Sequence, residues 1–211
     1  MSAPTPSAKL RVVTPDVIEH QATNHYFDRN FNIQSVKVLP GEFYVTIKEQ
    51  MIVTVLGSCV AACIRDKDLG VGGLNHFMLP DSGGGVASTS ARYGAYAMEL
   101  LINNILKMGG RRHRLEAKIF GGGRVMATLA NSNVGERNVA FVREFLRNEN
   151  IPIVAEDLLD VYPRKVYFFP FNGKVKLKKL LSTHNDTLAQ REQAYVATLS
   201  KQEVSGDVEL F

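Results

Sequence analysis

Short runs rich in β-branched residues alternate with only two strongly amphipathic helical segments, and this alternation limits the possible folds more than any other feature. The first helical segment spans residues 88–110, and its apolar side chains recur at helical spacing: Met98, Leu101, Ile102, Ile105 and Leu106. The second spans residues 136–150 and has one apolar side: Val139, Val142 and Leu146. Because strands precede, separate and follow these two main helices, the sequence predicts an α/β (α+β) layered sandwich with mixed β-sheets.

The strand-like runs are bounded by glycine and polar turn residues. They cover residues 41–57, 59–65, 71–79, 114–123, 151–157 and 165–180. The last run is a hairpin around Asn172-Gly173, and the polar turn "DKDLG" joins the second run to the third. We therefore expect a single domain over residues 41–182. An N-terminal extension over 1–40, partly disordered, precedes it, and a C-terminal helix and tail over 183–211 follow it.

The 211-residue chain holds only two cysteines, Cys59 and Cys63. Two cysteines so close together cannot build a disulfide framework, which indicates a reducing, cytoplasmic compartment. The N-terminus lacks the apolar core of a signal peptide, and no later run reaches the roughly 20 apolar residues of a membrane span. We therefore expect no membrane insertion.

The formal net charge of +4 reflects two basic segments, 109–118 and 171–181. Such segments favour an acidic partner, although a solvated surface is the more ordinary role of a charge run. The sequence contains no zinc-ligand spacing, RNP-like aromatic motif or arginine-rich arm, so nucleic acid is not an expected partner.

The hairpin joined by "DKDLG" carries both cysteines and one histidine. If its turn is centred between Lys67 and Asp68, residues whose numbers add up to 135 face each other. Cys59 then lies directly opposite His76, with Cβ atoms about 5 Å apart. A one-residue bulge would instead place the two side chains on different faces of the sheet.

This pairing suits a cysteine nucleophile, which needs a nearby acid or base. The backbone amides of Ser58 and Cys59 can stabilise a developing oxyanion, and His76 can form an ion pair with the thiolate. The nearby groups that could orient His76 are the hydroxyls of Thr54 and Ser58 and the neighbouring amide of Asn75.

Structural roles are also possible for these residues. A free cysteine in an apolar strand is most often a small buried hydrophobe, and this description fits Cys63 well. The glycine triplet at 121–123 lacks the residues of a phosphate loop and is predicted to be a turn. Two cysteines and one histidine are too few for a closed zinc site, so the sequence predicts no metal and no cofactor.

Four segments in order, "TVLGSCVAAC", "GGLNHFMLPDSGG", "KIFGGGRVM" and "VGERN", resemble the chemoreceptor glutamine deamidase family of bacterial chemotaxis. The resemblance extends from about Phe43 to Leu180 and implies that residues 41–182 form the catalytic domain. It implies Cys59 as the nucleophile, His76 as its acid–base partner and Thr54 as the third member, with Ser58 as the rival for that place.

The resemblance also implies the reaction and the partners. Selected glutamines on the cytoplasmic helices of methyl-accepting chemotaxis receptors would be hydrolysed to glutamate, with methylesterase activity as a possible side reaction. Some family members bind a chemotaxis phosphatase. The competing hypothesis is a non-catalytic adaptor that binds receptors or such a phosphatase. A cysteine peptidase is disfavoured because the residues before Cys59 do not follow a papain-like pattern.

Overall fold

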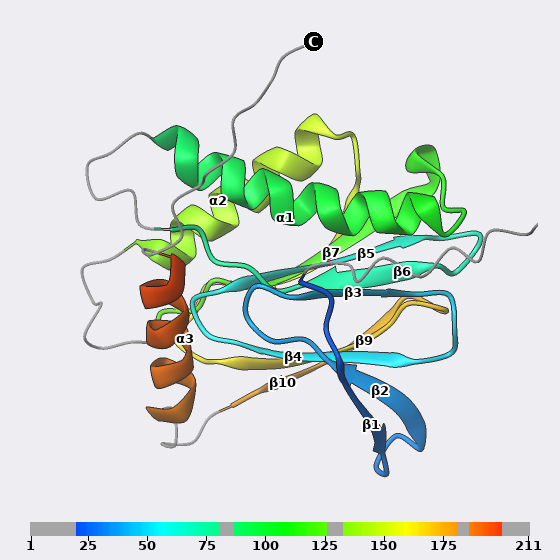
Figure 1. Cartoon of the computed structure of the whole chain (residues 1–211), viewed down its shortest axis with the longest axis horizontal. Coiled ribbons are helices and arrows are strands. Elements are labelled where there is room, and N and C mark those ends of the chain that lie inside the picture. The colour runs from blue at the N-terminus through cyan, green and yellow to red at the C-terminus, as the bar shows by residue number, and fades with distance from the viewer. Residues whose placement is uncertain (1–19, 81–86, 126–132, 181–185, 200–211) are drawn as a thin grey trace, which may run out of the picture.

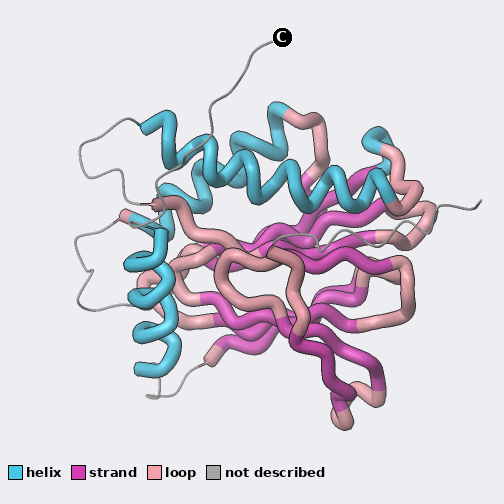
Figure 2. Tube along the Cα trace, viewed as in Figure 1, coloured by secondary structure: helices cyan, strands magenta, loops and turns pink. Residues whose placement is uncertain are grey.

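The computed structural model describes residues 20–80, 87–125, 133–180 and 186–199. Two five-stranded sheets stack on each other, and two helices cover the outer face of one of them (Figures 1 and 2). The arrangement is a three-layer sandwich that combines mixed sheets with two main helices. The fold class predicted from the sequence is thereby confirmed.

The first sheet is mixed. Its strands, in spatial order, are β3 (Phe43–Thr46), β6 (Gly72–Asn75), β5 (Val60–Asp66), β7 (Leu115–Gly121) and β8 (Ile153–Leu158). Strand β8 runs parallel to β7, and the other pairs are antiparallel. A short 3₁₀ helix, η1 (Arg112–Arg114), precedes β7.

The second sheet is mixed as well. Its strands, in spatial order, are β1 (Asn24–Asp28), β2 (Ile33–Lys37), β4 (Met51–Leu56), β9 (Arg164–Phe169) and β10 (Lys174–Lys179). Strand β2 runs parallel to β4, and the predicted hairpin of β9 and β10 is present. Gly173, in the left-handed region with φ of +71°, lets the chain reverse there.

Helices α1 (Ala87–Lys107) and α2 (Val134–Asn148) lie on the outer face of the first sheet (Figure 1). Successive residues of β5 point to opposite faces, so this strand contributes to two cores. Val60, Ala62 and Ile64 pack with the helices, whereas Ala61 and Cys63 pack between the two sheets. The third helix, α3 (Asp186–Leu199), stands beside the ends of the strands (Figure 1). No described helix has the length and hydropathy required to cross a bilayer.

Two regions differ from the sequence-based expectation. The run over residues 41–57 is two strands in different sheets, β3 and β4, and Ile47 in the turn between them is half exposed. The N-terminal extension expected over residues 1–40 supplies β1 and β2, which are two of the five strands of the second sheet. Residues 1–19 and 200–211, where tails were expected, lie outside the described residues.

The hairpin register also differs, by two residues. Cys63 pairs with Leu74 and Val60 with Phe77, so the numbers of facing residues add up to 137 rather than 135. The cause is the turn, in which the Asp66 carboxylate accepts hydrogen bonds from the amides of Asp68 and Leu69 and Gly70 adopts a φ of +74°. Ala61 is therefore the residue that faces His76.

Candidate functional site

The loop Gly57–Cys59 carries the candidate nucleophile from one sheet to the other, because it joins β4 to β5. The predicted glycine turn after β7 holds this loop. Gly122 donates its amide to the Cys59 carbonyl at 2.8 Å, and Gly123 donates to the Gly57 carbonyl at 2.7 Å. Gly121 adopts a φ of +112°, and a Cβ atom there would lie 2.2 Å from the Cys59 carbonyl oxygen. Only glycine fits this position.

Helix α2 fixes the same loop from the opposite side. Asn138, fully buried on the apolar face of α2, donates its side-chain amide to the Ser58 carbonyl at 2.9 Å. Its side-chain oxygen accepts the Leu79 amide, also at 2.9 Å. One side chain thus connects the loop before β5 to the segment that follows His76.

Thr54 and His76 come from different sheets and meet between them. The Thr54 hydroxyl lies 2.8 Å from the Val38 carbonyl oxygen and 2.8 Å from His76 Nδ1. Because a hydroxyl has one proton and a carbonyl can only accept, this proton goes to Val38, and His76 Nδ1 must donate to Thr54. The contact therefore fixes the tautomer, and Nε2 of neutral His76 keeps a free lone pair.

His76 is buried, and its Nε2 atom has no hydrogen-bond partner among the described residues. Burial lowers the pKa of His76 to about 3, and the Val38 carbonyl opposes this shift only in part. The imidazole is therefore neutral at pH 7. A buried acceptor without a partner costs about 1–3 kcal/mol, so its retention points to a chemical role.

Cys59 and His76 lie on the same face of the first sheet, although not directly opposite each other. Since Ala61 faces His76, Cys59 is the diagonal neighbour, two residues before Ala61 and immediately before β5. A two-residue change of register keeps every side chain on its face, whereas a one-residue change would not. The structure thus brings Thr54, His76 and Cys59 to one region between the sheets.

Helix α3 places a carboxylate directly on the Gly57–Cys59 loop. Glu192, which is 1% exposed, accepts the Gly57 amide at 2.9 Å and the Cys59 amide at 3.4 Å through Oε1. Its Oε2 accepts the Ser58 amide at 3.1 Å and the Ser58 hydroxyl at 2.7 Å. The same amides were expected to face a developing oxyanion, and here they surround a negative charge.

The thiol of Cys59 is kept protonated in this arrangement. Burial is the main reason that its pKa lies well above the ordinary value, and the charge of Glu192 and its hydrogen bond with the thiol raise it further. The described state therefore holds a thiol and a neutral imidazole. The thiolate–imidazolium pair expected from the sequence is not present in it.

The secondary candidates have other partners. The Ser58 hydroxyl donates to Glu192, so Thr54 is the residue that contacts the imidazole. Asn75 accepts the Ala62 amide at 3.0 Å and donates to the Ala97 carbonyl at 3.1 Å, contacts that tie β6 to β5 and α1. Cys63 is also buried between the sheets, where burial raises the pKa of its thiol.

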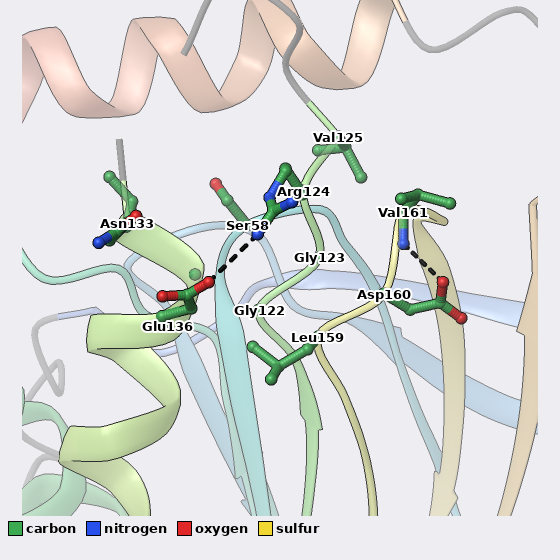
Figure 3. A pocket seen from close by; sticks show the side chains of 12 residues that line it. Ser58, Gly122, Gly123, Arg124, Val125, Asn133, Glu136, Leu159, Asp160 and Val161 are labelled. Atoms are coloured by element: carbon green, nitrogen blue, oxygen red, sulfur yellow. Dashed lines mark hydrogen bonds and ion pairs between the residues drawn. The ribbon is translucent and has the colours of Figure 1, made fainter. Parts of the chain in front are cut away.

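A cavity of about 180 Å³ opens beside Ser58 (Figure 3). Its walls are the glycine turn, the first turn of α2 and the loop 159–161. Leu159 and Asp160 both adopt positive φ, and the buried Arg164 holds this loop through the Leu159 carbonyl. Among the described residues, no three His, Cys, Asp or Glu side chains are grouped so that they could hold a metal ion.

Two residues of the site were not identified as candidates from the sequence. Glu192 is the acidic member of an otherwise apolar stripe on the C-terminal helix, with Leu188, Tyr195 and Leu199. Asn138 interrupts the apolar side of α2, next to Val139. A polar residue within an apolar helix face was the available signal, since such a residue must find a buried partner.

Comparison with known proteins gives a consistent result. The model of the family described as "CheD chemotactic sensory transduction" matches residues 78–179. "Probable chemoreceptor glutamine deamidase CheD 1" of Dechloromonas aromatica is 63% identical over 194 residues, which cover 92% of this chain and 96% of that relative. The "Probable chemoreceptor glutamine deamidase CheD" of a Janthinobacterium species is 63% identical, and that of Thiobacillus denitrificans is 61% identical. Each alignment covers 92% of this chain and 97% of the relative. The chain therefore belongs to the CheD family.

Proposed function

We propose that this protein hydrolyses selected glutamine side chains of methyl-accepting chemotaxis receptors to glutamate and so regulates chemotaxis. The observation that carries this proposal is the contact between Thr54 and His76, which leaves Nε2 with a buried free lone pair on the face that carries Cys59. Relatives at 51–63% identity are named as chemoreceptor glutamine deamidases. A cytoplasmic site of action follows from the proposed substrate.

The proposed reaction begins with proton transfer from the Cys59 thiol to His76 Nε2. The thiolate attacks the side-chain carbonyl carbon of glutamine, and the Gly57–Cys59 amides receive the negative charge that develops on oxygen. Protonated His76 gives its proton to the departing nitrogen, so the carbon–nitrogen bond breaks and ammonia leaves. A thioester remains on Cys59.

Water completes the cycle. His76, neutral again, takes a proton from a water molecule, which attacks the thioester and releases glutamate and the Cys59 thiol. Thr54 holds the imidazole in the tautomer that both steps require. A glutamate methyl ester would form the same thioester with loss of methanol, so methylesterase activity is a side reaction of the same site.

The docking of a receptor helix needs exposed surface near this site. The basic segment 109–118 is poorly suited, because η1 lies at the start of β7 whereas the Cys59 loop adjoins its end, about 20 Å away. Two of its arginines also form ion pairs within the chain. Strand β10 is the better candidate because its end lies near the Cys59 loop. In the sheet, Lys179 lies opposite Arg164 of β9, and Arg164 lies opposite Leu56, which just precedes that loop.

Mass spectrometry of a receptor cytoplasmic fragment tests the proposal. Wild-type protein should raise the mass by about 1 Da at discrete glutamines, and Cys59→Ala should abolish this gain while leaving receptor binding intact. Cys63→Ala is the matched control, because it removes the other cysteine, which lies on β5 just after the Cys59 loop. If the wild type binds the fragment without changing its mass, the protein is an adaptor for receptors or for a chemotaxis phosphatase.

A further inference from the structure

The position of α3 has a chemical meaning that goes beyond packing. Hydrolysis of glutamine produces glutamate, and α3 presents a glutamate to the loop that carries the candidate nucleophile. The Glu192 carboxylate has the size and shape of a glutamine carboxamide. One carboxylate oxygen accepts two backbone amides, as the oxygen of a substrate amide would.

The carboxylate also acts on the reacting group. Its charge and its side-chain interaction both raise the pKa of the Cys59 thiol, in addition to its hydrogen bonds with the loop amides. A Cβ atom added at Gly57 would lie 2.6 Å from Glu192 Oε1, so the carboxylate fills the space that this glycine leaves open. No other side chain could occupy this place while Glu192 remains there.

Elsewhere on α3, the buried contacts of the side chains that the structure describes lie along one side. Tyr195 packs its ring against Gly41, and its hydroxyl bonds with the Tyr93 hydroxyl of α1. Leu199, one further turn along, is buried. The side chains of Arg191, Gln193 and Ala194 are exposed, and α3 contributes to neither sheet. A helix attached in this way can leave without disturbing the sandwich.

We propose that α3 is an intramolecular competitor, in which Glu192 occupies the position of the substrate side chain and must be displaced before a receptor glutamine can bind. This inference rests on the proposed deamidase function. Departure of Glu192 would free the loop amides and remove a negative charge that opposes formation of the Cys59 thiolate.

The sharpest test turns the competitor into a substrate. In Glu192→Gln, the introduced amide lies where the reaction takes place, and water should convert it to glutamate with release of ammonia. Peptide mass spectrometry of the full-length variant should show a gain of about 1 Da at position 192. The double variant Glu192→Gln, Cys59→Ala should show none, and the native Gln190 and Gln193 of the same helix should stay unchanged.

A second variant measures the competition directly. Glu192→Ala should raise both the initial rate on a receptor fragment and the rate of Cys59 alkylation by iodoacetamide. An increase on the order of tenfold is expected as the open population grows. Gln193→Ala, on the exposed side of α3, is the matched control and should leave both rates unchanged. Cys63 serves as an internal reporter of folding, because it should remain unreactive in every variant.

The possible outcomes separate the two proposals. If position 192 stays an amide and Glu192→Ala accelerates nothing, while the wild type deamidates the receptor fragment, α3 is not a competitor and the proposed function stands. Conversion at position 192 without any activity on the receptor fragment supports the role of α3 and overturns the receptor as substrate. If neither reaction occurs in any variant, both proposals fail.

Discussion

Replacement of Thr54 by valine tests whether a single hydroxyl orients the imidazole. Valine has nearly the same shape and suits a strand, so the change removes little apart from the contacts to Val38 and His76. Each buried polar group left without a partner costs about 1–3 kcal/mol. The Val38 carbonyl already interacts with the imidazole, so the two groups can partly satisfy each other. We therefore expect the free energy of unfolding to fall by about 2 kcal/mol.

The effect on turnover should be larger than the effect on stability. If His76 moves towards the Val38 carbonyl, Nε2 turns away from the position that proton transfer requires. The rate of receptor-fragment deamidation should then fall on the order of 10²-fold, which is the lower end of what a positioned general acid–base contributes. Receptor binding should not change, because Thr54 is fully buried.

Thr54→Ser is the matched control, since it keeps the hydroxyl and removes only a methyl group. It should retain most of the wild-type rate and lose about 1 kcal/mol of stability. Urea unfolding and mass-spectrometric initial rates measure the two quantities separately. Equal loss of turnover in the serine and valine variants would refute the hydroxyl as the orienting group, and so would a valine variant with the wild-type rate.

Three further changes test the support of the site through urea unfolding. Backbone strain at Gly121→Ala should cost about 1–3 kcal/mol, and the total loss should be larger because the new Cβ atom would clash with the Cys59 carbonyl. Gly109→Ala also has positive φ, but its Cβ atom would make only an ordinary contact with Leu69, so this control should cost only the strain. Asn138→Leu leaves the Ser58 carbonyl and the Leu79 amide without their partner and should lower the free energy of unfolding by about 2–4 kcal/mol. A loss below about 1 kcal/mol would contradict the role of Asn138 in holding the Cys59 loop. Burial would raise the pKa of Asp66, but hydrogen bonds outweigh it and lower this pKa from 3.8 to about 2, so the stabilisation is complete above pH 3.8 and is lost as the pH falls towards 2. Asp66→Asn should remove this part of the acid dependence, and an unchanged pH profile would contradict it.

The sequence carried enough information for the layers and for the identity of the central residues. Helical spacing in α1 and α2, the apolar run of β5 and the alternation in β7 and β9 are local patterns, and local patterns survive folding. Strands β1 and β2 were missed as sheet members because each has only five residues and β1 is mostly exposed. The split of residues 41–57 was missed because both halves suit a strand.

The finer geometry of the site depends on contacts between distant parts of the chain. The register was displaced because Asp66, predicted to be the first turn residue, is the last residue of β5 and also binds the amides of the turn. Glu192 contacts a loop that precedes it by 135 residues at Gly57. No local pattern encodes such a contact, although an acidic residue in an apolar stripe signals that some buried donor must exist.

The division of the site between two sheets has a consequence for the newly made chain. Thr54 lies on β4, which pairs with β2 on one side and with β9 on the other. The ribosome produces Cys59 and His76 early, but β9 begins only at Arg164. The second sheet, which holds the Thr54 hydroxyl against the imidazole, is therefore completed only late in synthesis. Under the proposed mechanism, Cys59 lacks a fully supported acid–base partner until β9 has been made.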